Sequence, residues 1–592
     1  MGWKDEPVVF LTKKTWRYSE GNRFWVVLYI CLFTIANSID LLWPLLVAKI
    51  LNVIQEQGVT SQNLHSLLIY LLLFIALTVG FWIFHGPARV IEIKNAFLVR
   101  ANYKKYLLDG VMTLPPEWHA NHHSGNTIDR IEKSTAALYS FSTDSYEVIE
   151  TIVRFIGSYI ALAYFNLHSS YIVLGMVIIT IFLILRFDRI LVRQYSELYK
   201  AENGISAKIF DTISNITTVI VLRVEKLFSN AIFRKIMQPL ILFRRNSKIN
   251  EVKWFLVSIC ASVMVVLVLF SYLYLEVKTG AVIMIGTIFA LYSYVDKINS
   301  LFFRFAYKYS DIVKQKTAVL NGEEIAKDFV VKKKADVVTL DENWKRIEIK
   351  TLSFAYPQKK AAKIHLDAIS MTMKHGEKIA FIGDSGSGKT TVLKVMRDLY
   401  HPQTGTITLD GEILPHGFKS ISSAISLIPQ DPEIFSTTIK ENITFGAPRT
   451  LAEIKVFSDI ARFTDVVPQL PKGLNSFIFE RGVNLSGGQK QRLALARGLM
   501  ASVDKEIILL DEPTSSIDSK NELEIYKNIF SYFKDKTIIS SIHRLHLLTL
   551  FDIIYYFRDG KIIASGSFQD LLKLPHFKRM WEKYSRTMEK NK

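Results

Sequence analysis

The chain has 592 residues, of which 49% are hydrophobic, and a formal net charge of +18. It is too long for one typical domain and too apolar for an entirely soluble protein. The positive charge is explained by basic residues that flank membrane spans and attract anionic lipid, and no base-reading motif accompanies it. We therefore expect a lipid bilayer, and no nucleic acid, as a partner.

Six long apolar segments, all before about residue 320, predict six membrane spans, because a helix needs about 20 apolar residues to cross a bilayer. They comprise residues 25–51, 67–84, 254–275 and 279–295, and the stretch 155–185, which is long enough for two spans joined at the polar sequence NLHSS. The cytoplasmic connections, residues 85–150 and 186–253, exceed what a loop needs, so the helices are expected to continue beyond the membrane.

Lysine and arginine residues collect on one side of these spans. The outer connections at residues 52–66 and 166–170 contain neither, so both termini are predicted in the cytoplasm. The N-terminal sequence MGWKDEPVVF lacks the apolar core of a cleavable signal peptide. The abundance of Lys, Ile and Asn suggests a bacterial inner (cytoplasmic) membrane.

The chain divides at a charged, irregular linker. From Ile347 onward short β-rich runs alternate with helical patterns, which predicts an α/β domain with a largely parallel sheet. The predicted plan is a cytoplasmic N-terminal segment (1–24), an all-α transmembrane domain with six long helices (25–320), a linker (321–345), the α/β domain (346–585) and a C-terminal tail (586–592).

A glycine-rich loop follows the predicted strand KIAFI and precedes a helical pattern. It reads Gly383, Asp384, Ser385, Gly386, Ser387, Gly388, Lys389, Thr390, a complete G-x-x-x-x-G-K-[ST] phosphate loop, and Thr391 follows it. The glycines let backbone N–H groups surround a β-phosphate, the lysine bridges β- and γ-phosphates, and the threonine hydroxyl binds Mg²⁺. The motif predicts a mononucleotide site.

A second motif is the apolar strand EIILL, which ends in Asp511 and Glu512. A carboxylate at the exposed tip of a buried strand holds Mg²⁺, and the next one polarises an attacking water. We therefore predict Asp511 and Thr390 as metal ligands and Glu512 as the catalytic base. The alternative, a charged helix cap, is disfavoured by the phosphate loop in the same domain.

Between these motifs lies NLSGGQKQRLALARGL, in which Leu485, Ser486, Gly487, Gly488 and Gln489 match the signature of the ATP-binding-cassette (ABC) family, which the chain resembles. Two glycines and a serine at a helix start form a second anion-binding nest. In the family this nest binds the γ-phosphate held by a partner domain. The resemblance therefore implies ATP and Mg²⁺ as cofactors, with two P-loop NTPase cassettes closing head to tail around two ATP molecules.

Four more positions match the family pattern. Tyr356 stands where an aromatic ring stacks on adenine, Gln430 where a glutamine senses Mg²⁺ and the attacking water, and His543 where a histidine contacts the γ-phosphate. Asp518 closes the sequence SSID, which departs from the commoner SALD of the loop that links the two sites. The resemblance adds all four to the nucleotide-binding residues, Gln430 and His543 to the catalytic ones, and Gln430 to the metal ligands.

Six spans ahead of one cassette resemble an exporter-type ABC half-transporter. This implies a homodimer, or a dimer with a related half-transporter, and ATP-driven alternating access for a lipophilic or amphipathic small molecule, lipid or peptide. It also implies that Glu480, Arg481 and Gly482 contact the membrane domain. The tips of the cytoplasmic extensions, expected near residues 116–125 and 204–211, are expected to dock on the cassettes.

Other functions fit the same motifs. An importer on the exporter scaffold stays open, because no motif encodes direction. An ATP-gated channel or regulator also keeps the motifs, although it has less need of Glu512. A soluble nucleic-acid-associated ATPase is disfavoured by the spans.

Charged residues inside the predicted spans are candidate functional positions, because ionisable groups are costly in lipid. They are Asp40, Arg154, Asp296, Lys297 and Arg304. Either they contact substrate or they pair with one another in a wet cavity wall, and the sequence leaves both possibilities open.

Overall fold

The structure is a computed structural model that describes residues 6–122, 124–329, 340, 343–356, 364–479 and 485–590. It divides into two compact units, Met1–Val330 and Val331–Lys592. The division falls inside the segment that the sequence assigns to the linker. We describe each unit by itself.

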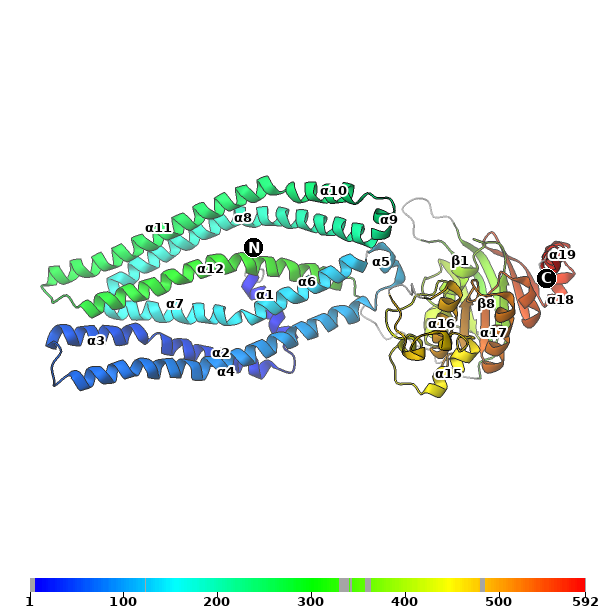
Figure 1. Ribbon diagram of the computed structural model, residues 1–592, viewed down its shortest axis with the longest axis horizontal. Coiled ribbons are helices and arrows are strands. Elements are labelled where there is room, and N and C mark those ends of the chain that lie inside the picture. The colour runs from blue at the N-terminus through cyan, green and yellow to red at the C-terminus, as the bar shows by residue number, and fades with distance from the viewer. Residues whose placement is uncertain are drawn as a thin grey trace. The chain divides into compact units, whose positions relative to one another are not determined.

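The regular elements described in the first unit are helices, several of them very long (Figure 1). They are α1 (Pro7–Tyr18), α2 (Arg23–Asp40), α3 (Trp43–Gln57), α4 (Leu64–Val111), α5 (Pro116–Asn121), α6 (Ser124–Thr143), α7 (Ser145–Phe165), α8 (Leu167–Ser214), α9 (Ile216–Val221), α10 (Glu225–Met237), α11 (Leu240–Thr279) and α12 (Ile285–Ala326). The all-helical prediction for this half is confirmed.

Within the described residues, five helical segments are long and apolar enough to cross a membrane. They are Arg23–Gln57, Leu64–Val111, Ser124–Phe165, Leu167–Ser214 and Glu225–Thr279. The predicted division of residues 155–185 is confirmed, since α7 and α8 separate at Asn166, whose side chain caps α8. The expected sixth span coincides with α12, which is not among the five, because polar residues such as Asp296 and Lys297 interrupt its apolar sequence. A sixth crossing therefore stays a prediction.

The two expected tips have different outcomes. The first is present, because α5 and the turns around it separate α4 from α6. The second, at residues 204–211, is wrong: α8 continues through it to Ser214, and the chain turns around α9 instead. A glycine inside a helix costs only about 1 kcal/mol, so Gly204 does not end a helix of 48 residues.

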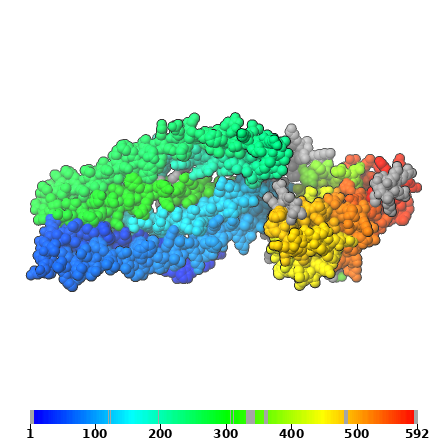
Figure 2. Space-filling model, in the orientation of Figure 1, coloured from blue at the N-terminus to red at the C-terminus, as the bar shows by residue number. Residues whose placement is uncertain are grey.

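The helices of the first unit pack around α12, which contacts α3, α6 and α7, while α8 and α11 run side by side. Figure 2 shows the blue helices α2–α4 and the green helices α11 and α12 as adjoining bands of this unit. Val257 of α11 and Leu291 and Tyr294 of α12 are fully buried in the core between them. Many residues on the outer surfaces of α4, α8 and α11 are exposed and apolar, as expected of helices that face lipid.

The second unit contains two sheets. A four-stranded antiparallel sheet has the order β2-β1-β4-β5, and a six-stranded sheet has the order β10-β9-β3-β8-β7-β6, in which β10 alone is antiparallel. The strands are β1 (Arg346–Phe354), β2 (Leu366–Lys374), β3 (Lys378–Ile382), β4 (Thr404–Leu409), β5 (Glu412–Ile413), β6 (Ile425–Ile428), β7 (Ile507–Asp511), β8 (Thr537–Ser541), β9 (Ile553–Arg558) and β10 (Lys561–Gly566). The predicted, largely parallel sheet is confirmed, and the antiparallel sheet is an addition to it.

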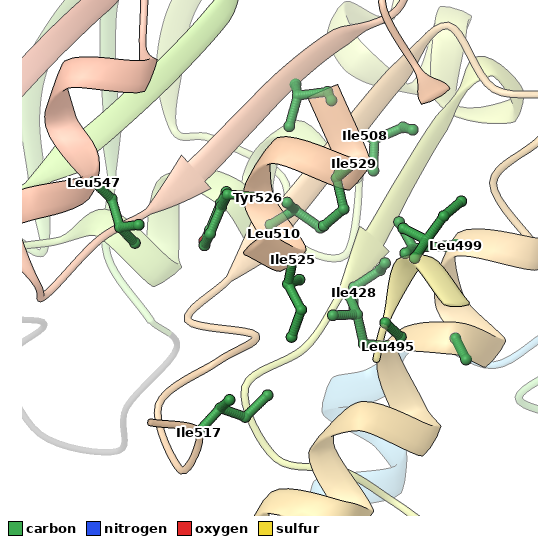
Figure 3. Close-up of a cluster of buried hydrophobic side chains, with 14 of the residues drawn as sticks. Ile428, Leu495, Leu499, Ile508, Leu510, Ile517, Ile525, Tyr526, Ile529 and Leu547 are labelled. Atoms are coloured by element: carbon green, nitrogen blue, oxygen red, sulfur yellow. The ribbon is translucent and has the colours of Figure 1, made fainter. Parts of the chain in front are cut away.

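Most helices cover one face of the six-stranded sheet: α14 (Ile439–Thr444), α15 (Leu451–Ile460), α16 (Gly487–Met500), α17 (Ser519–Tyr532), α18 (Phe568–Leu572) and α19 (Pro575–Lys590). The smaller sheet lies over the other face, and α13 (Lys389–Met396) packs in the core on that side. Alternate residues of β7 enter two cores: Ile508 and Leu510 pack against the helices, and Ile507 and Leu509 pack toward the smaller sheet. Figure 3 shows Leu510 beside Ile525 of α17. Burial on both faces explains why this strand reads as a continuous apolar run.

Candidate nucleotide-binding and catalytic site

The phosphate loop joins β3 to α13. Gly383 has a φ of +143°, and a Cβ on it would lie 2.2 Å from the carbonyl oxygen of Phe557, so no side chain fits there. Gly386 and Gly388 also have positive φ values. These conformations are open to glycine and costly for other residues. The glycines of the motif are therefore required by the backbone that carries the loop.

Lys389 opens α13 and is buried under its own loop. Its ammonium donates to the carbonyl oxygens of Gly383, at 2.8 Å, and Asp384, at 3.1 Å. Burial lowers the pKa of Lys389. In the described part of the chain, the buried hydroxyl of Ser387 has no hydrogen-bond partner. The loop thus holds a cation and a spare hydroxyl donor at the positions where the motif predicts phosphate oxygens, which fits ATP.

The predicted metal ligands Thr390 and Asp511 lie together. The Thr390 hydroxyl donates to Asp511 Oδ1 at 2.9 Å, and Ser541, the last residue of β8, donates to the same oxygen at 2.8 Å. Burial raises the pKa of Asp511. Hydroxyl and carboxylate oxygens are the donors that Mg²⁺ prefers, so this pair fits the cation. Ser541 was not identified from the sequence, although it precedes His543 by only two positions.

Glu512 contacts Gln430 and His543, the two residues that the resemblance added to the catalytic ones. Gln430 donates its side-chain N–H to Glu512 Oε2 at 2.8 Å, and His543 Nε2 lies 2.6 Å from Glu512 Oε1. The backbone of Glu512 has a φ of +47°, and its N–H donates to the Ser541 hydroxyl at 3.0 Å. A left-handed backbone conformation is strained for a residue other than glycine, and such strained residues cluster at functional sites. The structure thus brings together the predicted base and its two expected neighbours.

The signature begins α16. The Ser486 hydroxyl accepts the N–H of Gln489, whose side chain in turn accepts the N–H of Ser486, which forms a capping box. A Cβ on Gly488 would lie 3.0 Å from the carbonyl oxygen of Ser516, so the signature helix approaches the SSID loop closely. Gln491 fixes this contact: it donates to the Ser515 hydroxyl and accepts the Ser516 N–H, both at 2.7 Å.

Three expectations have a different or partial outcome. The side chain of Asp518 caps α17 by accepting the N–H of Asn521 at 3.0 Å. Its contact with nucleotide stays a prediction. Tyr356 lies beside α13, with its hydroxyl 3.3 Å from that of Thr391. Glu480, Arg481 and Gly482 lie outside the described residues.

The charged residues of the predicted spans other than Asp296 form ion pairs between or within helices. Asp40 of α2 lies 2.8 Å from Lys297 of α12 and 3.2 Å from Arg154 of α7. Glu150 of α7 lies 2.8 Å from Arg154 and 2.7 Å from Arg304 of α12. We call these five residues the intramembrane charge network. Asp296 is exposed and, within the described residues, has no ion-pair partner.

The fold and the site define a nucleotide-binding P-loop domain fused to a helical membrane domain. Comparison with known families agrees: residues 366–515 match the ABC transporter domain, and residues 26–298 match the ABC transporter transmembrane region. The chain belongs to the ABC transporters, and its second unit is the ATPase cassette of such a transporter.

Similar proteins include ABC transporter B family member 21 of Arabidopsis thaliana, 33% identical over 272 residues, which are 46% of this chain and 20% of that protein. The ATP-dependent lipid A-core flippase of Burkholderia pseudomallei is 33% identical over 228 residues, which are 38% of each chain. The chain thus spans well under two thirds of the relatives it matches. The fold is similar to that of a solved structure, a bacterial Atm1-family ABC exporter determined with ATP bound, with a TM-score of 0.79 and 20% identity over 95% of this chain and 99% of that one.

Proposed function

We propose that the protein couples ATP hydrolysis in its cassette to the export of a lipophilic or amphipathic substrate, as a pair of identical chains. The observation that carries the proposal is the Glu512 carboxylate, bonded by Gln430 and His543 at the end of the strand that also presents Asp511. A channel or a regulator that only binds nucleotide has no need of a positioned base.

The residues have separable roles in this proposal. Lys389, Ser387 and the loop N–H groups bind the β- and γ-phosphates. Thr390 and Asp511 hold Mg²⁺, which neutralises phosphate charge, and Gln430 is proposed as a further ligand. Glu512 takes the proton of the attacking water, and His543 contacts the γ-phosphate.

A second copy is proposed because the signature is exposed. Ser486 and Gly487 lie at the solvent-facing start of α16, where the hydrogen bonds between Ser486 and Gln489 form a helix cap. A helix start of this kind is a ready anion site, and the nucleotide of a partner cassette supplies the anion. A related half-transporter is the alternative partner.

Relatives named as a lipid A-core flippase and P-glycoprotein 14, and the fold of an Atm1-family exporter, support an outward direction and an amphipathic substrate class. We propose a bacterial inner membrane location, with both termini and the cassette in the cytoplasm, from the distribution of basic residues along the chain.

The test is ATP-dependent accumulation of a lipophilic cationic dye in inside-out vesicles, with Glu512→Gln beside the wild type. Uptake by the wild type alone supports an exporter with a broad specificity. ATP hydrolysis without dye uptake points to a narrower cargo, such as a lipid or a peptide, or to inward transport, which right-side-out vesicles distinguish. A wild type that does not hydrolyse ATP overturns the proposal.

A further inference from the structure

A buried carboxylate outside the predicted site connects the two loops that carry the predicted catalytic residues. Glu522 of α17 is 4% exposed. Its Oε1 accepts the hydroxyl of Thr514 at 2.7 Å, and its Oε2 accepts Nη1 of Arg544 at 3.1 Å. Thr514 follows Glu512 by two positions, and Arg544 follows His543 directly. One side chain thereby fixes the segment after the base to the segment after the histidine.

Arg544 extends this connection to the SSID loop. Its Nη1 donates to the carbonyl oxygen of Ile517 at 2.6 Å, and its Nη2 donates to that of Ser515 at 3.4 Å. The same loop meets the signature helix through Gln491. Through Arg544, the contacts of Glu522 therefore extend to the SSID loop, and Gln491 joins that loop to the signature helix.

The C-terminal helix α19, labelled with α17 in Figure 1, contacts the segment that follows His543. The hydroxyl of Tyr584 lies 2.9 Å from Nδ1 of His546, and the two rings are nearly parallel, at 8°, with centroids 6.4 Å apart. His546 Nε2 lies 3.8 Å from Glu522 Oε2, beyond hydrogen-bond distance, so Tyr584 acts on the histidine loop by holding the His546 ring three residues after His543. Tyr584 also lines a pocket of about 400 Å³ that residues 383–385 and His543 line as well. The helix therefore borders the phosphate loop as well as supporting the histidine loop.

Stability alone does not account for a buried charge in this place. Replacing a buried ion pair by apolar residues of similar volume is often neutral or stabilising. Catalysis, in contrast, is sensitive to geometry, because a displacement of about 1 Å costs about 100-fold in rate. The contacts of Glu522 end within two residues of Glu512 and next to His543, where such a displacement matters most.

We propose that Glu522 is a positioning residue for ATP hydrolysis, which aligns the segments of Glu512 and His543 through Thr514 and Arg544, and that Tyr584 of α19 holds this alignment through His546. The inference rests on the proposed ATPase function. It assigns the C-terminal helix a role in turnover of nucleotide, beyond packing.

The experiment measures steady-state ATP hydrolysis and equilibrium binding of a fluorescent ATP analogue by the purified full chain. Glu522→Gln keeps the shape and loses the charge, so kcat falls about tenfold, while KM and analogue affinity stay within about twofold of the wild type. Glu524→Gln, on the same helix but partly exposed and, among the described residues, paired with Lys527, is the matched control and keeps the wild-type kcat. Tyr584→Ala lowers kcat more than Tyr584→Phe, which retains the ring stacked on His546.

Thr514→Val removes the hydrogen bond between the Thr514 hydroxyl and Glu522 without changing the glutamate. It serves as the test variant if Glu522→Gln does not fold. The double variant Glu522→Gln/Thr514→Val loses no more than the more affected single variant, because both act through one interaction. A wild-type kcat in Glu522→Gln, a loss that appears in analogue affinity instead of kcat, or additive losses in the double variant would each overturn the inference. The wild type and Glu512→Gln are measured in the same assay. If the wild type shows no turnover, the proposed ATPase function fails; if the wild type hydrolyses ATP and Glu522→Gln does so equally well, only the positioning role of Glu522 fails.

Discussion

Two sets of charged side chains, one in each unit, have opposite arrangements. Among the described residues of the cassette, Lys389 donates to carbonyl oxygens of its own loop, and Glu512 is bonded by Gln430 and His543, so both keep a charge that a ligand can use. In the membrane unit, Asp40, Arg154 and Lys297 are each matched by an opposite charge on another helix. The first arrangement is suited to binding phosphate, and the second to holding helices together.

The largest effect is expected at the cassette carboxylate. Glu512→Gln removes the general base, so hydrolysis falls by about 10²–10⁴-fold, while ATP binding is retained because the amide preserves the shape of the side chain. Measured ATPase activity and trapping of a closed nucleotide-bound dimer check this. Turnover near that of the wild type would remove Glu512 from its assigned role.

The next effect is expected at the most buried ion pair of the membrane unit. Lys253 of α11 and Asp188 of α8 lie 3.1 Å apart, with side chains 2% and 6% exposed. Asp188→Leu leaves a buried ammonium uncompensated and costs about 3–5 kcal/mol of stability, whereas Asp188→Leu/Lys253→Met recovers most of it. Thermal unfolding of the detergent-purified protein measures both.

The control for this pair is Glu197→Ala, since Glu197 lies in an exposed pair with Arg193 on the same helix. An exposed pair contributes about 0–1 kcal/mol, so its loss shifts the melting temperature little. A double variant as unstable as Asp188→Leu would show that the residues contribute by shape instead of by charge pairing.

A smaller effect is expected at the phosphate-loop lysine. Lys389→Ala removes charge-assisted hydrogen bonds to phosphate worth about 1.5–3 kcal/mol, which corresponds to about 10- to 100-fold weaker ATP binding. Lys394→Ala, five residues further along α13, is the control, because this lysine lies outside the motif. Equal loss in the two variants would indicate a general effect of positive charge and contradict the phosphate-loop assignment.

The cassette was predictable from its sequence because its chemistry is local. The glycines, Lys389 and Thr390 lie within the short segment 383–390, and backbone geometry alone brings them together. The residues that were missed, Ser541 and Glu522, act through contacts with Asp511 and Arg544, which lie 30 and 22 positions away in the chain. No spacing rule identifies a buried glutamate that bonds two loops, so such residues require the folded structure.

For the membrane unit, the sequence predicted the positions of the long helices but not all of their ends or the ion pairs between them. Apolar segments located the long helices, but the tip expected at residues 204–211 was wrong, because a lone glycine costs only about 1 kcal/mol and does not end a long helix. The pairing of Asp40 with Lys297 joins positions more than 250 residues apart, at 2.8 Å. It depends on the register between α2 and α12, which hydropathy does not encode.

The smallest effect is expected in the intramembrane charge network. Asp40 is 32% exposed and Lys297 is 21% exposed, so each single substitution, Asp40→Asn or Lys297→Gln, costs about 1 kcal/mol or less of stability. The double variant Asp40→Asn/Lys297→Gln leaves no unpaired charge at these two positions and returns the melting temperature toward that of the wild type. Thermal unfolding in detergent measures all three.

Transport by the same double variant then decides between the two roles that the sequence left open. If the pair only joins α2 to α12, stability and transport recover together. If either side chain contacts substrate, transport stays low although stability has recovered, because a neutral pair restores packing without restoring a charge for the ligand. Asp296→Asn sharpens the result: this exposed residue, unpaired within the described chain, is expected to change transport without changing stability if its carboxylate faces the substrate path. A loss of stability in Asp296→Asn would place this residue with the structural pairs instead.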